Sequence, residues 1–362
     1  TLFLCLGVGL TGAFLSGDLF NLFVFAELLV ISGTILTAIS DDRFGAEAAF
    51  KYFYISLLAS TFMLLAIGCL YISYGSLNMA DIAMRILMNP DQPLLMVAAA
   101  FMTATFMVKS AVFPFHFWQP DFHAAAPTPV SAMLSSVVVK LGVYGFIRMT
   151  TLLFVQQSQE LKFLLIVSGI IGVFFGGFSA IGTHNAKRML AYSTLAQIGF
   201  ILVGIGWGTP LSIAAALVFT FNHSLIKAAM LMLSGSVASR TYTKSAAFDI
   251  ISGMGKCMPY AGVLFFVGSL ALAGIPPTNG FISKYLIFDS GVAIGEFLAL
   301  FALALGGLLS LIYTMRAFQR IWWQQKEDSD SIKPKGDRLI APTLLIMLIL
   351  ALGVWAEPLV QV

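Results

Sequence analysis

The chain has 362 residues, of which 59% are hydrophobic and only 10% are charged, with a formal net charge of +3. A soluble globular domain carries about 25% charged residues, so this composition excludes a surface that faces mainly water and predicts a membrane protein. The small, dispersed net charge excludes nucleic-acid binding, and Cys5, Cys69 and Cys257 lack the spacing of a metal or disulfide framework.

Eleven stretches are apolar enough to predict membrane-spanning helices, because a span needs about 20 mostly apolar residues. Thr1 already lies inside the first of them, with no methionine and no signal-peptide n-region, so we expect further chain before it. The sequence therefore predicts an all-α polytopic membrane helix bundle, with spans at residues 1–15, 17–40, 47–74, 92–117, 128–153, 161–183, 187–207, 210–236, 258–288, 292–323 and 340–360.

One segment between the third and fourth spans is too short to cross a membrane. It runs from Ser76 to Asn89, and its polar residues Asn78, Asp81 and Arg85 recur at helical spacing. This pattern predicts an amphipathic helix that lies on the membrane surface.

Two of the spans are interrupted by proline. Pro114 breaks the fourth span, and the sequence GIPPTNG, residues 274–280, breaks the ninth. Proline frees a backbone carbonyl, which lipid cannot satisfy, so such breaks are typical of helices that line a transport path. The two broken spans are five apart and cross in opposite directions, which favours two inverted five-helix repeats over unrelated kinks. We expect the first repeat at 1–153, the second at 154–338 with a tail loop, and a terminal helix at 339–362.

The basic residues predict the orientation of the bundle. Of 20 lysines and arginines, four lie deep within spans and three (Arg85, Arg148 and Lys162) lie on one side. The positive-inside rule makes the richer side cytoplasmic and places Val362 outside. That side holds or borders Arg43, Lys51, Lys187, Arg188, Arg240, Lys244, Lys256, Arg316, Arg320, Lys326, Lys333, Lys335 and Arg338.

A row of ionisable residues lies within the predicted spans. A lysine near the bilayer centre costs about 2.5–3.5 kcal/mol, so four of them would cost on the order of 10–14 kcal/mol if charged and unpaired. Pairing, hydration or deprotonation must offset this cost, and each of these places the side chain in the interior of the bundle. The row is the candidate site for proton translocation and consists of Glu27, Lys109, Lys140, His223, Lys227 and Lys284.

The chemistry of the row suits proton transfer. A glutamate and a lysine stabilise each other's charged forms, and imidazole exchanges protons near neutral pH. His223 and Lys227 stand four residues apart and share a helical face. His116 and His123 flank the first break and are candidates for feeding it, although His116 also fits an interfacial residue. The alternative interpretation is that the row packs or holds helices. The sequence shows no nucleotide cradle, metal cluster, iron–sulfur motif or nucleophile triad, so we expect no cofactor, no metal and no enzyme activity of its own.

Five long motifs, in this order along the chain, resemble a known family: GDLFNLFVFAELL, KSAVFPFHFWQPDFHAAAPTPVSA, VVVKLGVYGFIR, KRMLAYSTLAQIGF and LAGIPPTNGFISKYL. They are similar to the antiporter-like proton-channel subunits. That family includes the D subunit of multisubunit (Mrp-type) sodium/proton antiporters and the antiporter-like membrane subunits of respiratory complex I and membrane-bound hydrogenases. The resemblance covers residues 1–360.

The resemblance also implies roles for the row. Glu27 and Lys109 would form a modulating ion pair, and Lys140 would be the central proton carrier. His223 and Lys227 would form the connecting relay, and Lys284 the exit toward the opposite side.

The motifs leave the subfamily open. SLNMADI and TGAFLSGDLFNLFVF are most similar to the D subunit of Mrp antiporters, whereas WQPDFHAAAPTPVSA is closer to complex I and hydrogenase relatives. Ala26 stands where an aromatic residue usually precedes the glutamate, and no long lateral helix follows the last span.

We therefore expect a proton-translocating subunit of a multisubunit sodium/proton antiporter in a prokaryotic cell membrane. Its partners would be other membrane subunits, protons, lipids and, in the antiporter, Na⁺. Two alternatives stay open: a proton-pumping subunit of a complex I-type NADH:quinone oxidoreductase or hydrogenase, and a structural scaffold without flux. A self-contained transporter is disfavoured because no dedicated substrate pocket can be recognised.

Overall fold

The computed structural model describes residues 1–39, 42–324 and 336–357, and within these ranges the protein is built of helices. The predicted cytoplasmic lysines Lys326, Lys333 and Lys335 and the predicted outer end at Val362 lie outside the described residues. The first half contains α1 (Leu2–Leu15), α2 (Leu19–Ala38), α3 (Arg43–Tyr74), α4 (Met79–Met88), α5 (Leu95–Lys109), α6 (Trp118–Ala125), α7 (Thr128–Met133), η1 (Leu134–Val138), α8 (Lys140–Arg148) and η2 (Met149–Leu153). The second half contains α9 (Ser158–Gly182), α10 (Ala186–Trp207), α11 (Pro210–Ser239), α12 (Phe248–Ile251), α13 (Pro259–Ala273), α14 (Asn279–Ile294), α15 (Phe297–Phe318), η3 (Gln319–Trp323) and α16 (Ile340–Val354).

Seven helical segments of the described chain are long and apolar enough to cross a membrane unaided, which confirms a polytopic membrane protein. They correspond to α2, α3, α7 through η2, α9, α10, α11, and α15 through η3. The four remaining predicted spans contain the shorter apolar helices α1, α5, α13 and α16. Two of these four are short because the chain breaks the helix, as the proline positions predicted.

Both predicted breaks are present, but the helical segment after the first break lies further along the chain than the sequence predicted. Helix α5 ends at Lys109 and the chain becomes helical again in α6, which continues to Ala125, beyond the predicted end of that span at residue 117. Helix α13 ends at Ala273, where Gly274 adopts a left-handed conformation with φ of +80°, and α14 begins at Asn279. The left-handed turn favours glycine because a side chain there is strained.

The predicted amphipathic surface helix is α4. Asn78 caps its N-terminus, because its side chain accepts hydrogen bonds from the backbone N–H groups of Ala80 and Asp81. Asp81 and Arg85 pair one turn apart at 2.9 Å on its exposed face. The Arg85 guanidinium also donates to the Tyr74 carbonyl at 2.7 Å, which fixes α4 to the end of α3.

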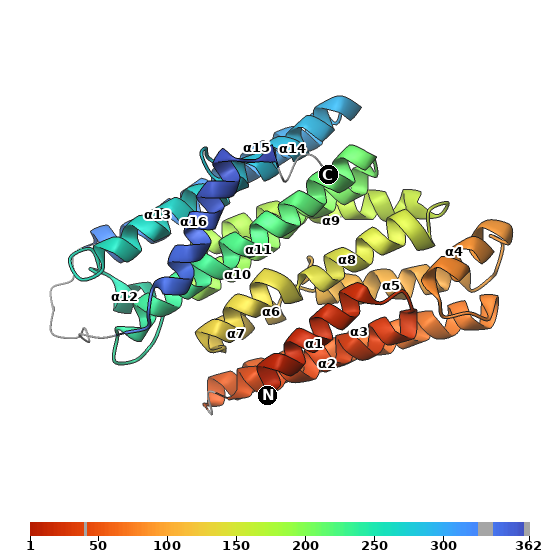
Figure 1. Ribbon diagram of the computed structural model, residues 1–362, viewed down its shortest axis with the longest axis horizontal. Coiled ribbons are helices and arrows are strands. Elements are labelled where there is room, and N and C mark those ends of the chain that lie inside the picture. The colour runs from red at the N-terminus through yellow and green to blue at the C-terminus, as the bar shows by residue number, and fades with distance from the viewer. Residues whose placement is uncertain (40–41, 325–335, 358–362) are drawn as a thin grey trace.

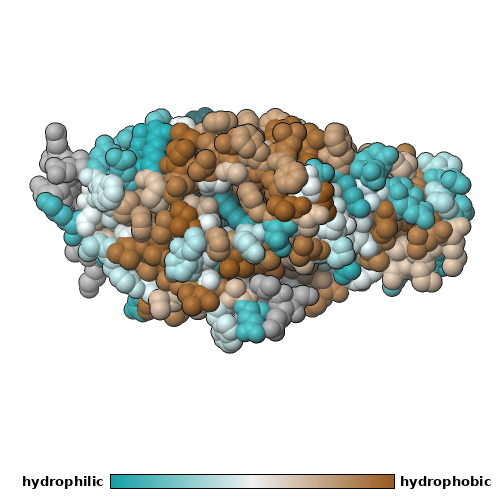
Figure 2. Space-filling model, turned by 90° about the horizontal axis from the view of Figure 1, so that it is seen from above, coloured by the Kyte–Doolittle hydropathy of each residue, from teal (hydrophilic) through white to brown (hydrophobic). Residues whose placement is uncertain are grey.

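The helices lie side by side in a bundle, with α1 to α5 on one side and α13 to α16 on the other (Figure 1). Helix α10 runs through the interior, since 94% of its apolar 18-residue stretch is buried against neighbouring helices. The surface seen in Figure 2 is largely apolar, with polar residues gathered mainly toward its two ends. This distribution is expected for a bundle whose middle faces lipid.

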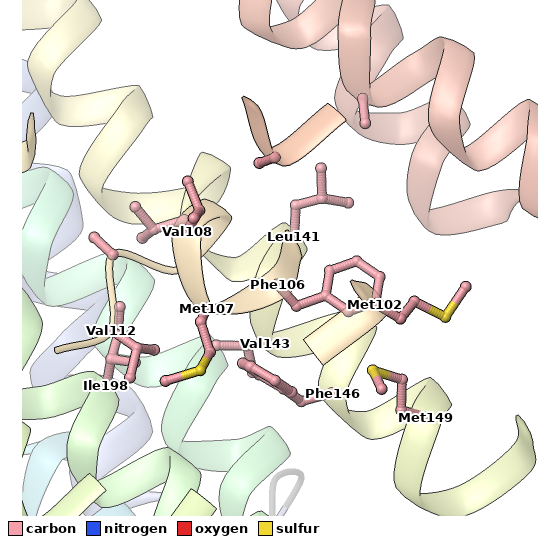
Figure 3. Packing of buried hydrophobic residues seen from close by; sticks show 14 of the residues in the cluster. Met102, Phe106, Met107, Val108, Val112, Leu141, Val143, Phe146, Met149 and Ile198 are labelled. Carbon is pink, nitrogen blue, oxygen red and sulfur yellow. The ribbon is translucent and has the colours of Figure 1, made fainter. Parts of the chain in front are cut away.

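Small residues allow close packing where the first break meets α8. A Cβ added to Gly142 would lie 2.7 Å from the Phe106 carbonyl oxygen and 2.0 Å from Ser110 Oγ, so the backbones of α5 and α8 approach directly there. Figure 3 shows the apolar side chains around this crossing, including Phe106 and Phe146, whose rings meet edge to face at 6.1 Å. The crossing places Lys109, at the end of α5, close to the helix that begins with Lys140.

Candidate functional site

Glu27, on α2, and Lys109, at the end of α5, form an ion pair. Lys109 Nζ lies 3.8 Å from Glu27 Oε1, with 6% of the lysine side chain and 23% of the glutamate side chain exposed. The hydroxyl of Ser60, on α3, donates to the same carboxylate oxygen. Among the described residues no group hydrogen-bonds Lys109 Nζ, so the pair is electrostatic and leaves the ammonium donors unused. The pairing that the resemblance implied is therefore present in the geometry.

Lys140 begins α8 and is buried directly behind a π-helical turn. The segment η1 widens the helix immediately before Lys140, and π-helical turns are frequent at functional sites. Lys140 Nζ donates to the Ser135 carbonyl at 2.6 Å, and Ser135 Oγ lies 2.8 Å from Thr194 Oγ1 on α10. Only 3% of Lys140 is exposed, and no carboxylate of the described chain pairs with it.

Lys227 and His223 lie on the buried face of α11, as their spacing predicted. Lys227 is fully buried, and its Nζ donates to the Leu190 carbonyl at 2.8 Å and to Ser193 Oγ at 2.7 Å, both on α10. His223 is 2% exposed and lies within electrostatic reach of Lys140, Lys227 and Lys284. Neither ring nitrogen of His223 finds a hydrogen-bond partner among the described residues.

Lys284 lies just after the second break and uses that break for its hydrogen bonds. Its Nζ donates to the carbonyls of Leu272 at 3.1 Å and Ala273 at 2.8 Å, at the C-terminus of α13. The same ammonium lies 5.0 Å from the centre of the Phe200 ring. Carbonyls at a helix C-terminus carry partial negative charge, so they stabilise a cation where lipid cannot.

His123 lies at the depth of this row, although the sequence suggested only a flanking position. It is fully buried on α6, and its Nδ1 lies 3.3 Å from the Ser131 hydroxyl. Lys140, Lys187 and Lys227 all lie within electrostatic reach of its ring, and Nε2 has no hydrogen-bond partner in the described chain. His116, by contrast, packs among aromatic rings: it stacks on Phe113 at 5.6 Å and meets Phe175 edge to face.

An acidic residue in α6 joins three helices at one end of the bundle. Asp121 pairs with Lys51 of α3 at 3.1 Å and with Arg188 of α10, while 22% of its side chain is exposed. Because Asp121 lies two residues before His123 on the same short helix, these ion pairs also fix the position of the histidine.

A polar cavity of about 880 Å³ opens at the same end of the bundle. Its walls include the start of α3, the segment between α6 and α7, the start of α10 and the end of α11. Lys187 lies in its wall and donates to the Ala126 carbonyl at 3.1 Å, three residues from His123. Water in such a cavity would therefore reach the neighbourhood of the buried row.

Several buried polar atoms along the row have no hydrogen-bond partner within the described ranges: Lys109 Nζ, Gln119 Nε2, His123 Nε2, both ring nitrogens of His223, and Asn279 Oδ1. Buried polar groups usually bind a partner or ordered water, so we expect water to bridge these positions. Five of the six predicted residues are thus buried and the side chain of Glu27 is 23% exposed, and within the described ranges the direct contact between members of this set is the Glu27–Lys109 pair.

The sequence reasoning missed the neutral partners of the lysines. Ser193 and Gln197 share a face of α10, and Ser310 and Tyr313 share a face of α15, all four being at most 2% exposed. Their spacing of four and three residues inside apolar helices is the signal that could have identified them.

Comparison with known proteins finds a matching family and relatives that align with nearly the whole chain. Residues 16–310 match the family described as NADH:quinone oxidoreductase/Mrp antiporter, TM. The chain is 32% identical over 358 residues to the D subunit of the Na⁺/H⁺ antiporter of Bacillus subtilis (strain 168), covering 98% of this chain and 72% of the relative. It is 33% identical over 365 residues to the N subunit of the NADH-quinone oxidoreductase of Desulforudis audaxviator (strain MP104C), again covering 98% of this chain and 72% of the relative.

Solved structures share the fold over 99% of this chain. A chain of the membrane-bound sulfane sulfur reductase, an archaeal respiratory membrane complex, is 32% identical with a TM-score of 0.89, and 72% of it is covered. A chain of the Mrp complex from Dietzia sp. DQ12-45-1b has a TM-score of 0.88 at 24% identity, with 75% of it covered. These structural neighbours are subunits of multisubunit membrane complexes.

Proposed function

Because the chain belongs to the family of NADH:quinone oxidoreductase and Mrp antiporter membrane subunits, we propose that it is a proton-translocating subunit of a multisubunit sodium/proton antiporter. The observation that carries this proposal is the buried axis. Four lysines, each at most 8% exposed, lie within the helices of the bundle, and one of them, Lys109, pairs with the partly buried Glu27. Ionisable residues at this depth are costly and are typical of ion and proton pathways.

In this proposal the ion pair controls the axis. Lys109 is held by charge alone and makes no hydrogen bond with a described residue, so a small movement of α5 or α2 would separate it from Glu27. Separation changes the electrostatic potential along the axis and shifts proton occupancy from one lysine to the next. Lys140 is the central carrier, His223 and Lys227 connect it onward, and Lys284 is the exit.

Replacing Lys140 with alanine tests the proposal. In the assembled complex, reconstituted in vesicles, Lys140→Ala should abolish proton movement while the subunits still co-purify. Normal transport by a normally assembled complex would contradict the relay. Loss of assembly without any intrinsic loss of flux in the complexes that remain would instead support the scaffold alternative.

The sodium/proton antiporter is favoured because two D-type antiporter relatives match nearly the whole chain at 32% and 33% identity. The second candidate, a component of a redox-driven complex, is favoured by the similarity to the oxidoreductase relative at 33% and to the sulfane sulfur reductase at 32%. In that case the protein would belong to an enzyme complex while catalysing no chemistry itself. Mass spectrometry of the purified native complex distinguishes them: small antiporter subunits support the first candidate, and iron–sulfur subunits the second.

We further propose that residues 1–153 and 154–338 are inverted five-helix repeats, followed by a terminal helix at 339–362. The order of elements supports this division. Each half has an interrupted helix and then a helix that ends in a π-helical segment, η2 in the first half and η3 in the second.

Matching backbone contacts also support the repeats. Asp18, which caps α2, forms an isolated antiparallel bridge with Asn78, at the start of α4. Asn185, which caps α10, forms the corresponding bridge with Ala247, at the start of α12. Inverted repeats would place these two bridges on opposite sides of the membrane.

The proposed orientation puts the basic end in the cytoplasm and the C-terminus outside. Asp42, Lys187, Arg188 and Lys244 line one cavity, which supports their location at the same end of the bundle. Single cysteines at Asn78→Cys and Ala247→Cys test both the orientation and the repeats. An impermeant thiol reagent added outside intact cells should label the first and not the second, and labelling of both from one side would contradict the scheme.

A further inference from the structure

A chain of neutral side chains leads away from Lys227 between α10 and α15, and within it the Gln197 amide joins Tyr313 to Ser310. Ser193 Oγ, which accepts from Lys227 Nζ at 2.7 Å, lies 2.8 Å from the phenolic oxygen of Tyr313. The Gln197 side-chain amide donates to Ser310 Oγ at 3.0 Å and to the same Tyr313 oxygen at 3.5 Å. Because hydroxyl groups both donate and accept, this chain has the chemistry of a proton wire.

The far end of the chain points toward Lys284. Ser310 lies one helical turn from Gly307 on α15, and a Cβ added at Gly307 would lie 3.8 Å from Lys284 Nζ. The glycine therefore leaves room beside the ammonium. A cavity of about 440 Å³ borders both Lys284 and Gly307; its walls are mainly apolar, and Lys284 and Tyr285 are the polar side chains in them that could bind water.

The alternative connection would run through His223 alone. Its ring lies within electrostatic reach of Lys140, Lys227 and Lys284. Among the described residues, however, no group hydrogen-bonds either ring nitrogen. Proton transfer needs a hydrogen-bonded contact or one bridging water at each step. The α10–α15 chain already supplies such contacts over most of the distance.

A purely structural role would also explain polar contacts between two membrane helices, since these hold helices together. One feature distinguishes the chain from such contacts: its first member, Ser193, accepts from the buried ammonium of Lys227, and its last member, Ser310, lies one helical turn from Gly307, which borders Lys284. Helix-holding hydrogen bonds have no need of either ammonium group.

We propose that protons pass between Lys227 and Lys284 along the hydroxyls of Ser193, Tyr313 and Ser310, with water completing the final step. The inference rests on the proposed function. When Lys227 releases a proton to Ser193, the Ser193 hydroxyl proton moves to Tyr313, the Tyr313 hydroxyl proton moves to Ser310, and the Ser310 hydroxyl proton moves through water to Lys284. One proton thus leaves Lys227, one arrives at Lys284, and each hydroxyl regains a proton. Gln197 has an amide donor here and is a positioning residue, which orients the Tyr313 and Ser310 oxygens.

The decisive variant is Tyr313→Phe, which removes one oxygen and keeps the ring that fills the core. In reconstituted vesicles of the whole complex we expect proton flux to fall roughly tenfold or more, with unchanged subunit composition. Tyr71→Phe is the matched control, because Tyr71 is 54% exposed on α3, away from the axis, and should keep wild-type flux.

A second variant excludes a merely structural effect. Ser193→Ala interrupts the same chain one step earlier, so the double variant Ser193→Ala with Tyr313→Phe should transport no more slowly than either single variant. Independent packing defects would instead multiply. Lys140→Ala in the same preparation separates the two proposals. If it stops flux while Tyr313→Phe leaves flux unchanged, the wire is wrong and the proposed function stands. If Lys140→Ala also leaves flux unchanged, the proposed function itself fails.

Discussion

Glu27 and Lys109 face each other with 3.8 Å between Oε1 and Nζ, a distance at which opposite charges attract but the ammonium does not reach hydrogen-bonding range. The carboxylate has a second partner in the Ser60 hydroxyl, whereas Lys109 Nζ has no hydrogen-bond partner in the described part of the chain. The Glu27 carboxylate is thus anchored by a hydrogen bond, whereas the Lys109 ammonium is held by charge alone.

Replacing Glu27 with glutamine removes the negative charge of this side chain while keeping its size and shape. Glu27→Gln keeps an oxygen that accepts from Ser60 but removes the counter-ion of Lys109, so we expect proton flux to fall at least about tenfold. Proton uptake into vesicles that contain the assembled complex measures this. Glu47→Gln is the control, since Glu47 is 55% exposed and pairs only with the exposed Lys51. Wild-type flux in assembled Glu27→Gln complexes would show that the pair exerts no control.

Gly142 should be intolerant of even one added methyl group. Its Cβ would lie 2.7 Å from the Phe106 backbone carbonyl, so α5 and α8 must separate and move Lys109 relative to Lys140. We expect Gly142→Ala to destabilise the protein by about 1–3 kcal/mol, visible as a lower Tm in detergent. Gly7→Ala, on α1, meets nothing within 4 Å and should be neutral or slightly stabilising. Equal Tm values for the two variants would contradict the close crossing.

The surface helix α4 should loosen in acid because of Asp81. Hydrogen bonds from Arg85 and then from Ser76 lower the pKa of Asp81 below its ordinary value of 3.8. A carboxylate whose pKa is lower in the folded state contributes stability above the unfolded value, and this contribution is lost as the pH falls through the folded value. Amide hydrogen exchange in α4 should therefore be faster in Asp81→Asn than in the wild type at neutral pH. The difference should close below a pH of about 3.8, whereas a difference that persists there would mean that the charge is not its cause.

The sequence was sufficient to predict the apolar helices, the two breaks and the burial of five ionisable residues, Lys109, Lys140, His223, Lys227 and Lys284. The spans follow from apolar length, and the breaks follow from proline chemistry at Pro114 and at the 274–280 segment. The buried charges stand out because each is costly in lipid. These features share one property: each is decided by a residue and its immediate neighbours.

The contacts of the axis could not be predicted, because they depend on how distant helices cross. The Lys140 ammonium donates to the Ser135 carbonyl within a π-helical turn, and nothing in the sequence around Leu134 predicts that turn. The sequence predicts a flanking position for His123 because its burial depends on α6, which begins at Trp118, after the predicted end of that span at residue 117. Serines, tyrosines and glutamines cost far less in a membrane than lysines do, so Ser193 and Tyr313 gave only a weak signal until their contacts were known.

The amide pair between α11 and α14 should hold the second broken helix in place. The Asn222 side chain donates to Ser283 Oγ at 2.8 Å and to the Asn279 carbonyl at 3.2 Å, and its oxygen accepts from the Asn279 amide at 3.0 Å. Asn222 directly precedes His223, and Ser283 directly precedes Lys284, so the pair sets the distance between two members of the axis.

Replacing Asn222 with alanine should therefore lower both stability and transport. The substitution leaves buried polar groups of Asn279 and Ser283 unsatisfied, which costs about 1–3 kcal/mol, and it frees α14 to shift Lys284 away from the α13 carbonyls. We expect a lower Tm and reduced proton flux in Asn222→Ala. Ser224→Ala is the matched control on the same helix, because the Ser224 hydroxyl bonds only to the carbonyl of Thr220 at 2.8 Å, within α11, and should leave both quantities near their wild-type values. A wild-type Tm in Asn222→Ala would mean that the break is held by the backbone of α13 and α14 alone, and a lower Tm with unchanged flux would mean that the pair supports the fold without positioning Lys284.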